Sequence, residues 1–223
     1  MAKQTVEEEL TLTLWDVKIK DLRRDCYRIR FETSRGNTQG ILHHKEGNVL
    51  GTVMVGGSGG GLDGPASIYR DMGPNLLEKN ISTLRLDYRH SNYLEECVLD
   101  ILMSIEFMKG MDMQKFGLVG WSFGGAVVID AGVASEDVQA VATVASQAYG
   151  TGPVEELAPK ALLLLHGTAD RALPPACSQD IYSRAREPKE LVFLEGGNHG
   201  IDQKRQEMME RIETFLAAHL SAE

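Results

Sequence analysis

The stretch Gly120-Trp121-Ser122-Phe123-Gly124 follows an apolar run, residues 116–119, and precedes a helix-like run, residues 125–131. A Gly-x-Ser-x-Gly between a strand and a helix holds the serine on a sharp, strained turn, because a Cβ on either glycine would clash with the neighbouring strand and helix. Such a turn lifts the Ser122 hydroxyl clear of the sheet, where a base and a substrate carbonyl can both reach it. Because the pentapeptide occurs often by chance, its meaning depends on the rest of the chain.

The order of apolar patterns along the chain predicts the α/β fold class. After residue 51, short β-branched apolar runs alternate with helical patterns, which indicates βαβ units and a parallel sheet. Residues 9–20, 27–32 and 40–44 alternate apolar and polar side chains and predict three antiparallel, half-exposed strands. With no internal repeat and no Pro/Ser-rich linker, residues 1–223 are expected to form a single domain. The predicted parallel strands are residues 52–55, 82–86, 117–119, 140–145, 161–165 and 191–194, and the predicted helices are residues 93–109, 175–187 and 203–220.

The composition argues against several classes of partner. Of the 223 residues, 43% are hydrophobic, which is enough for a sizeable core. The formal net charge of −9 argues against nucleic acid, since no basic stripe is present to neutralise phosphates, and an acidic surface also repels anionic membranes. The sequence has no 18-residue apolar run and no apolar leader, so we expect a cytoplasmic protein. The three cysteines show no metal-ligand spacing and are expected to be reduced thiols, with a disulfide between two of them left open.

Two residues further along the chain complete a nucleophile, base and acid set with Ser122. A serine hydroxyl is a poor nucleophile at neutral pH and needs an adjacent base, which a third group holds in the correct tautomer. His199 follows the last predicted strand in a glycine-bracketed loop, and Asp170 follows the strand at 161–165. Each lies at the carboxyl end of its own strand, where open α/β sheets bind their ligands. We therefore identify Ser122 as the candidate nucleophile, His199 as the base and Asp170 as the orienting acid.

An acyl-transfer site also needs hydrogen-bond donors for the oxyanion that develops in the transition state, and removing one donor costs about 3–4 kcal/mol. In a turn of this kind the backbone N–H of Phe123 supplies the first donor. The glycine-rich loop 56–61 follows the first parallel strand and lets bare backbone amides approach a carbonyl. By register against the end of that strand, Ser58 supplies the second donor, with Gly57 and Gly59 as alternatives.

The same loop also fits a dinucleotide-binding pattern. Residues 59–64 satisfy G-x-G-x-x-G after a strand, and Asp87 follows the next strand at the distance expected of a ribose-binding acid. Against this interpretation, Asp63 and Pro65 crowd the proposed helix start, and Asp63 brings negative charge toward a pyrophosphate. Three strands also precede the loop, whereas this fingerprint usually opens its domain. A P-loop is excluded, because no Gly-Lys-Ser/Thr follows.

Taken together, these motifs resemble those of the α/β-hydrolase superfamily, and within it those of the small dienelactone-hydrolase-like members. The resemblance covers residues 25–220. It implies an eight-stranded, mostly parallel sheet with an antiparallel second strand, acyl-enzyme chemistry at Ser122, His199 and Asp170, and no cofactor. The motifs that carry it are the loop 56–61, Leu86-Asp87-Tyr88-Arg89, the turn 120–124, His166-Gly-Thr-Ala-Asp170 and Gly197-Asn-His199-Gly.

The chain departs from that family pattern in two places. Many dienelactone hydrolases use a cysteine nucleophile, whereas Ser122 is closer to ordinary carboxylesterases and thioesterases. Many members also begin the oxyanion loop with His-Gly, where this chain has Gly56-Gly57. That change leaves the backbone donors but removes a side chain that often steadies the loop. Residues 1–24 match nothing specific in the family and are interpreted as an N-terminal extension, either an extra edge strand or a dimer contact.

The space available for a lid restricts the expected substrate. Lid domains of this superfamily usually follow the sixth strand, where only fourteen residues, 146–159, are present. We therefore expect no large cap domain and an open site suited to a small or protruding acyl group. Besides the glycines of the oxyanion loop, the expected substrate contacts are Trp121, Arg89 and Tyr149, with Arg89 facing a substrate carboxylate unless it forms a surface salt bridge.

The function predicted from these residues is a serine hydrolase that cleaves small carboxylic esters or thioesters. Two alternatives stay open. An acyltransferase uses the same triad with an amine or thiol acceptor in place of water. A non-catalytic binding protein of this fold usually lacks Ser, Asp or His, and all three are present here. The sequence encodes neither the physiological substrate nor the oligomeric state.

Overall fold

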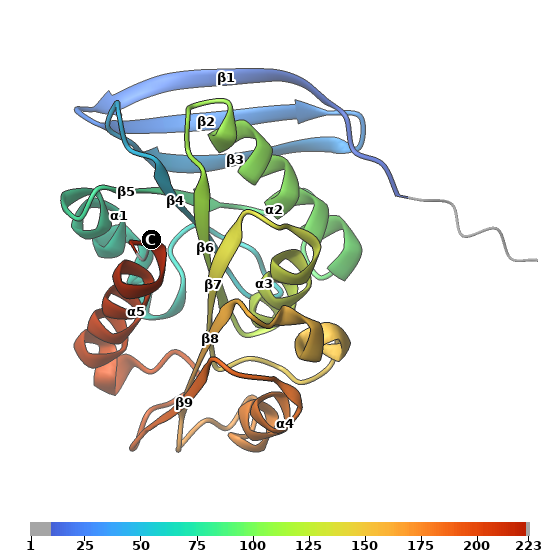
Figure 1. Ribbon diagram of the computed structural model, residues 1–223, viewed down its shortest axis with the longest axis vertical. Coiled ribbons are helices and arrows are strands. Elements are labelled where there is room, and N and C mark those ends of the chain that lie inside the picture. Colours follow the sequence, from blue (N-terminus) through green and yellow to red (C-terminus); the bar gives the residue numbers. More distant parts are fainter. Residues whose placement is uncertain (1–9, 222–223) are drawn as a thin grey trace, which may run out of the picture.

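Within residues 10–221, which the computed structural model describes, the strands form one sheet of nine (Figure 1). Their order is β1-β2-β3-β5-β4-β6-β7-β8-β9. The pairs from β5 to β9 are parallel, and the pairs among β1, β2, β3 and β5 are antiparallel. The strands are β1 (Leu14–Arg23), β2 (Cys26–Thr33), β3 (Gly36–His43), β4 (Leu50–Val55), β5 (Ile81–Leu86), β6 (Lys115–Trp121), β7 (Val138–Val144), β8 (Ala161–Gly167) and β9 (Lys189–Leu194).

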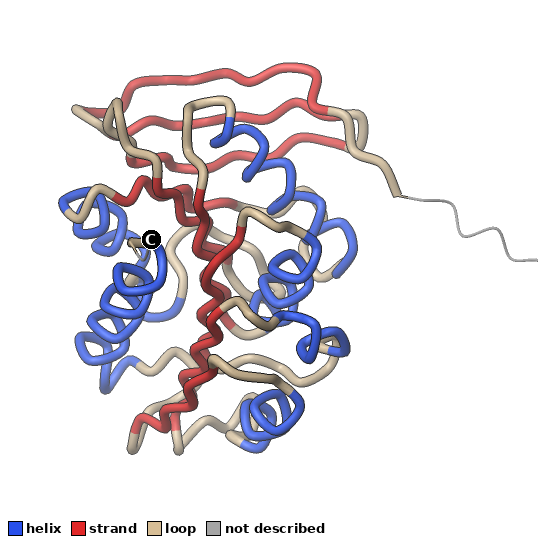
Figure 2. The backbone as a smooth tube through the Cα atoms, in the orientation of Figure 1, coloured by secondary structure: helices blue, strands red, loops and turns tan. Residues whose placement is uncertain are grey.

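Helices cover both faces of this sheet. In Figures 1 and 2, α1 and α5 lie on one face, and α2, α3 and α4 lie on the other. The two hydrophobic clusters follow this division, since one packs the sheet against α2 and α3 and the other packs it against α1 and α5. The helices are α1 (Tyr69–Glu78), α2 (Leu94–Lys109), α3 (Phe123–Ala134), α4 (Ala176–Arg184) and α5 (Arg205–Leu220), with short 3₁₀ segments η1 (Pro65–Ser67), η2 (Gly152–Leu157) and η3 (Asp202–Lys204).

The fold class and the parallel strands agree with the prediction because these strands have a distinctive composition. All seven residues of β8 are buried, and a strand covered on both faces is a continuous apolar run. Helix α1 was not among the predicted helices. It contains Gly73 and Pro74, which break the helical pattern in the sequence, and its packing against the sheet compensates for them.

The sheet has one strand more than the eight that the family resemblance implied. The additional strand is β1, which lies at the edge of the sheet and pairs antiparallel with β2. In the other eight strands, β3 is the antiparallel second strand that the resemblance implied. The eight-strand count is therefore corrected to nine, because part of the stretch 1–24 extends the sheet. Residues 1–9 of that stretch lie outside the described residues.

The three cysteines are free thiols. Cys26 and Cys97 are buried and Cys177 is half-buried. In the part of the chain that the structure describes, no helix combines the length and the apolar character needed to cross a membrane.

Strand β3 carries a buried histidine that lacks a polar partner. His43 is 3% exposed, and neither ring nitrogen has a hydrogen-bond partner among the described residues. The ring packs on Gly73 of α1, where a Cβ would lie 2.6 Å from it. Burial lowers the pKa of His43 to about 4, and the charges of Arg85 and Arg23 act in the same direction. The imidazole is therefore neutral in the folded protein at neutral pH.

We expect this histidine to make the fold acid-sensitive between pH 6.5 and about 4, which are the ordinary and folded pKa values of His43. The unfolded chain binds the proton first, so stability is full above this window and falls through it by about 3 kcal/mol. Denaturant titrations of wild type and His43→Leu across the window measure the effect. The variant should lose less stability on acidification than wild type. The acid sensitivity that comes from carboxylates is the same in both proteins, so the difference between them reports His43. Equal acid sensitivity of the two proteins would contradict this assignment.

Candidate active site

Ser122 lies on the turn between β6 and α3, with a φ of 58° and a ψ of −119°. A positive φ is strained for any residue with a side chain and marks a turn that its surroundings hold in place. A Cβ on Gly120 would lie 2.0 Å from the carbonyl oxygen of Gly124. A Cβ on Gly124 would lie 2.2 Å from the carbonyl oxygen of Gly56. Both glycines are therefore required for the turn to close against the helix and against the loop after β4.

The structure brings Ser122, His199 and Asp170 into one hydrogen-bonded chain. The Oγ of Ser122 lies 3.0 Å from Nε2 of His199, and Nδ1 of His199 lies 2.7 Å from Oδ2 of Asp170. Ser122 follows β6, Asp170 follows β8 and His199 follows β9, so the three side chains meet at the carboxyl edge of the sheet. These distances suit a hydroxyl that gives its proton to an imidazole oriented by a carboxylate.

The carboxylate of Asp170 is buried and held by several donors. Its Oδ1 accepts hydrogen bonds from the backbone N–H groups of Ala172, at 2.8 Å, and Leu173, at 3.0 Å. Burial by itself raises the pKa of Asp170, but the hydrogen bonds from His199 and these two N–H groups outweigh it and keep the pKa below its ordinary value. Asp170 is therefore ionised at neutral pH, as a group that stabilises a histidinium must be.

A second histidine contacts the same carboxylate. Nε2 of His166 lies 3.0 Å from the carbonyl oxygen of Leu173 and 3.3 Å from Oδ2 of Asp170, so this nitrogen carries the proton. The hydroxyl of Ser178 then donates to Nδ1 of His166 at 2.7 Å. Burial lowers the pKa of His166 and keeps the ring neutral. Sequence reasoning treated His166 as a neighbour of Asp170. Its position inside the His-Gly-x-x-Asp motif was the available signal for a contact with the carboxylate.

Backbone amides of two segments lie beside Ser122. The N–H of Phe123 opens α3 and so has no acceptor within the helix. A Cβ on Gly57 would lie 3.3 Å from Cβ of Ser122, which places the loop after β4 directly against the serine. The loop is fixed by a hydrogen bond from Gly60 N to Gly57 O, at 2.9 Å, while Ser58 is exposed at its tip. Phe123 with Ser58, or with Gly57 or Gly59, remains the predicted set of oxyanion donors.

Known proteins were compared with this chain by sequence and by structure. The scan against protein-family models found no match. The uncharacterized protein YfhR of Escherichia coli (strain K12) is 27% identical over 156 residues, a match covering 56% of this chain and 55% of YfhR. The chain thus spans about half the length of the curated relatives it matches.

Three solved structures superpose on most of the chain. The dienelactone hydrolase from Anabaena variabilis ATCC 29413 gives a TM-score of 0.77 at 17% identity, covering 87% of this chain and 98% of that one. The α/β hydrolase GrgF from Penicillium sp. sh18 gives 0.72 at 15% identity, covering 87% and 99%. The esterase domain of a Rhodothermus marinus protein gives 0.72 at 16% identity, covering 92% and 100%. The chain has the α/β-hydrolase fold.

The structure argues against the dinucleotide-binding alternative for residues 59–64 and Asp87. Helix α1 begins at Tyr69, so the glycines of residues 59–64 do not open a helix whose N-terminus receives a pyrophosphate. The carboxylate of Asp87 turns inward, since its Oδ1 accepts from Gly61 N at 2.8 Å and from Tyr88 N at 2.9 Å. Asp87 therefore ties the loop after β4 to the end of β5 and is not presented to a ribose.

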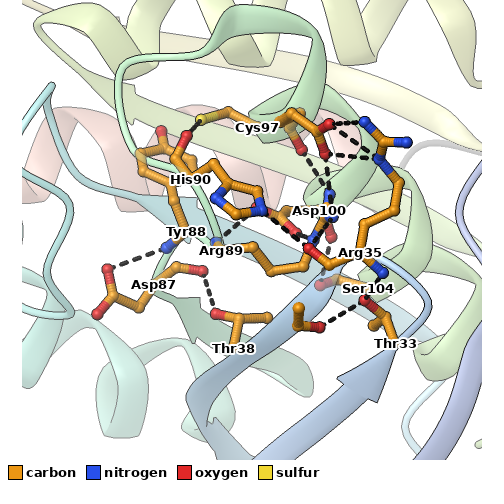
Figure 3. Close-up of polar contacts among 12 residues, drawn as sticks. Thr33, Arg35, Thr38, Asp87, Tyr88, Arg89, His90, Cys97, Asp100 and Ser104 are labelled. Atoms are coloured by element: carbon orange, nitrogen blue, oxygen red, sulfur yellow. Dashed lines mark hydrogen bonds and ion pairs between the residues drawn. The ribbon is translucent and has the colours of Figure 1, made fainter. Parts of the chain in front are cut away.

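Arg89 does not face the substrate, and this prediction is corrected. Its side chain is fully buried, and its Nε donates to Oδ1 of Asp100, while its Nη1 lies 3.0 Å from Oε2 of Glu96 (Figure 3). Its backbone N–H donates to Oδ2 of Asp100 at 2.9 Å. Arg35 approaches Glu96 from the turn between β2 and β3 and completes the network. Arg89 thus joins the segment after β5 to α2 and the antiparallel strands.

The last of the predicted side-chain contacts is Tyr149, on the segment between β7 and β8. The segment after β7 begins beside the serine, where Gln147 N donates to Ser122 O at 3.3 Å. Tyr149, further along this segment, is 86% exposed, so its contact with substrate stays a prediction. Between β7 and β8, 3₁₀ segment η2 is the only regular element, and no large cap covers the sheet there.

Solvent reaches the hydrogen-bonded chain at His199, whose side chain is 26% exposed, while the side chain of Asp170 is fully buried. Five surface cavities of 260 to 710 Å³ occur elsewhere on the described residues, and none of the five is lined by Ser122, His199 or Asp170. The expected small or protruding acyl group stays a prediction.

Trp121 anchors the loop that carries the histidine. Its indole Nε1–H donates to the carbonyl oxygen of His199 at 3.0 Å, and the two rings lie 5.5 Å apart between centroids. The residue beside the serine therefore holds the backbone of the base. This contact gives Trp121 a positioning role that the sequence did not reveal, where a substrate contact was predicted.

We expect Trp121→Phe to lower kcat for ester hydrolysis by about 5- to 10-fold with KM unchanged, since the loss of one hydrogen bond costs about 1 kcal/mol. Phenylalanine keeps one aromatic ring, removes the N–H donor and is smaller than the indole. Steady-state kinetics with p-nitrophenyl acetate measure both constants. Trp15→Phe is the matched control, because Trp15 is 69% exposed on β1. A change in KM alone would show that Trp121 contacts substrate instead.

Proposed function

We propose that this protein is a serine hydrolase that cleaves small carboxylic esters or thioesters through an acyl-enzyme intermediate. The observation that carries the proposal is the unbroken hydrogen-bond chain from Ser122 through His199 to Asp170 at the carboxyl edge of the sheet. The α/β-hydrolase fold supports it, and so do the printed names of two structures of similar fold, a dienelactone hydrolase and an esterase domain.

In the acylation half of the proposed reaction, Oγ of Ser122 forms a bond to the carbonyl carbon while its proton passes to Nε2 of His199. Asp170 accepts a hydrogen bond from Nδ1–H of His199 and stabilises the resulting imidazolium. The carbonyl oxygen becomes an oxyanion, which the N–H of Phe123 and a donor of the loop after β4 stabilise. As the tetrahedral intermediate collapses, the bond to the leaving alcohol or thiol breaks and His199 returns the proton to it.

Deacylation repeats these transfers with water. His199 removes a proton from a water molecule, whose oxygen bonds to the acyl carbon. The second tetrahedral intermediate expels Oγ of Ser122, which regains its proton from His199. The products are a carboxylic acid and the free enzyme. The absence of a large cap over the described sheet favours short acyl groups, because long chains gain little burial at an open site.

A fluorophosphonate probe tests this proposal. Such a reagent forms a bond from Oγ of an activated serine to phosphorus and expels fluoride, and an unactivated serine reacts poorly. Mass spectrometry of the digested protein is expected to find the label on the peptide that contains Ser122. Labelled protein should lose the ability to hydrolyse p-nitrophenyl acetate. A folded protein that takes up no label, or takes it up on another residue, would overturn the assignment.

The length of the acyl chain and the identity of the acyl acceptor test the same proposal further. We expect p-nitrophenyl acetate and butyrate to be hydrolysed faster than a long-chain ester, with free acid as the product in water. Acyl transfer to an added amine or thiol, without free acid, would instead favour the acyltransferase.

A further inference from the structure

The first strand leaves a long edge of the sheet unpaired. β1 has ten residues, about twice the usual strand length, and pairs with β2 along one edge. Within residues 10–221 its other edge has no partner strand. Trp15 is 69% exposed on it, Ile19 55% and Leu22 44%. Natural proteins usually protect such edges by shortness, proline, β-bulges or charged side chains. β1 is long and has no proline, its bulges lie only at its two ends, beside Trp15 and Leu22, and its charges are of both signs.

From the order of residues on this edge we propose that β1 pairs antiparallel with β1 of a second copy of the chain, about a two-fold axis at Val17. In that register Val17 meets its own copy and Asp16 lies opposite Lys18 on both sides of the axis, within the regularly paired part of β1. Trp15 lies in the bulge between Leu14 and Asp16 and is not assigned a partner. The two symmetric Asp–Lys pairs are favourable cross-strand combinations. The edge is thus complementary to itself.

The charges select this register over its neighbours. An axis at Lys18 places two lysines directly opposite each other, and an axis at Ile19 places Lys18 opposite Lys20. Like charges that face each other across strands are destabilising. The side chains of Asp16 and Lys18 are both more than half exposed. Lys18 also reaches Glu32 at 2.5 Å, and Oδ1 of Asp16 accepts a hydrogen bond from Val17 N at 2.9 Å, so pairing at the axis exchanges this bond for one to the second copy.

In this pairing the side chains of each β1 stay on the same face of the sheet as before. Val17 and Ile19 lie opposite the buried Phe31 and Ile29 of β2, so they belong to the face covered by α2. On that face an apolar groove of about 260 Å³ runs beside β1. A two-fold axis perpendicular to the sheet keeps each face on its own side, so the grooves of both copies lie on the same face of the paired sheet. The groove is lined by Leu12, Leu14, Leu99, Leu102, Met103 and Glu106.

Light scattering after gel filtration tests the pairing. Wild type is expected at twice the 24.5 kDa of one chain. Asp16→Lys places a lysine opposite Lys18 twice, and should weaken dimerisation by at least about tenfold. The double variant Asp16→Lys/Lys18→Asp exchanges the two charges and should restore the dimer. A monomeric wild type, or a dimer that Asp16→Lys leaves unchanged, would overturn the proposal.

A cysteine at the axis gives a second measurement that does not depend on stability. Opposite Cα atoms in an antiparallel pair lie about 4.5–5.5 Å apart, within the range that a disulfide spans. Val17→Cys should therefore cross-link to a covalent dimer under mild oxidation. Ile19→Cys is the control, because in this register Ile19 does not lie opposite its own copy and should not cross-link. Equal cross-linking of the two variants would show that another register or surface joins the copies.

Discussion

Ser122→Ala is expected to lower kcat/KM for p-nitrophenyl acetate by at least about 10³-fold without destabilising the fold. The hydroxyl is the proposed nucleophile, and its removal leaves only the oxyanion donors and substrate binding to accelerate attack by water. Alanine fits the turn as serine does, because both place a Cβ at the same strained φ of 58°. Steady-state kinetics, with thermal unfolding as the check on folding, measure the two effects.

A second serine provides the matched control for this change. Ser183 is exposed on α4, where its hydroxyl only donates to the carbonyl oxygen of Asp180. Ser183→Ala should therefore keep wild-type turnover. If Ser122→Ala retained more than about a tenth of wild-type kcat/KM, a change of under 1.4 kcal/mol, the proposed nucleophile would be wrong.

Asp100→Asn is expected to cost about 3–5 kcal/mol of the free energy of unfolding, because it leaves the buried guanidinium of Arg89 short of a counter-charge. Both side chains are fully buried, and the carboxylate of Asp100 accepts from the side chain and from the backbone N–H of Arg89. Asparagine keeps the shape and removes the charge. Denaturant titration of wild type and variant measures the loss.

Two further variants separate the charge pair from general sensitivity to substitution. Asp112→Asn changes an exposed aspartate at the end of the same α2 region and should stay within about 0.5 kcal/mol of wild type. The double variant Arg89→Met/Asp100→Leu removes both charges, and should lose less than the two single changes added together. A loss below about 1 kcal/mol for Asp100→Asn would show that water or other groups replace the carboxylate.

The sequence predicted the meeting of Ser122, His199 and Asp170 better than it predicted the residues around them, for a physical reason. Ser122, Asp170 and His199 each follow a buried apolar run, and parallel strands bring their carboxyl ends to one edge whatever the loops do. The apolar pattern of three strands therefore predicts that three residues far apart in the chain lie at the same edge of the sheet.

Arg89 shows where such reasoning fails. Its partners are set by the packing of α2 on the antiparallel strands, and no local pattern gives the distance between them. A signal did exist, since Glu96 and Asp100 are four residues apart on one helix face, and acidic residues on a buried face usually have a cation between them. The choice among Ser58, Gly57 and Gly59 as the second oxyanion donor stays a prediction for another reason, because the direction in which a backbone N–H points in a tight turn depends on the loop around it.

Strand β7 lies between β6, which precedes Ser122, and β8, which precedes Asp170, yet none of its side chains belongs to the proposed triad. Its backbone connects the two sides: Ser122 N donates to Val144 O at 2.8 Å, and Ala145, the residue after β7, donates its N–H to Leu165 O at 2.8 Å. The width of β7 therefore sets the distance between the backbone of Ser122 and that of Asp170. Substitutions in β7 that keep the side-chain volume leave this distance unchanged. An inserted residue in β7 would shift Ser122 relative to Asp170.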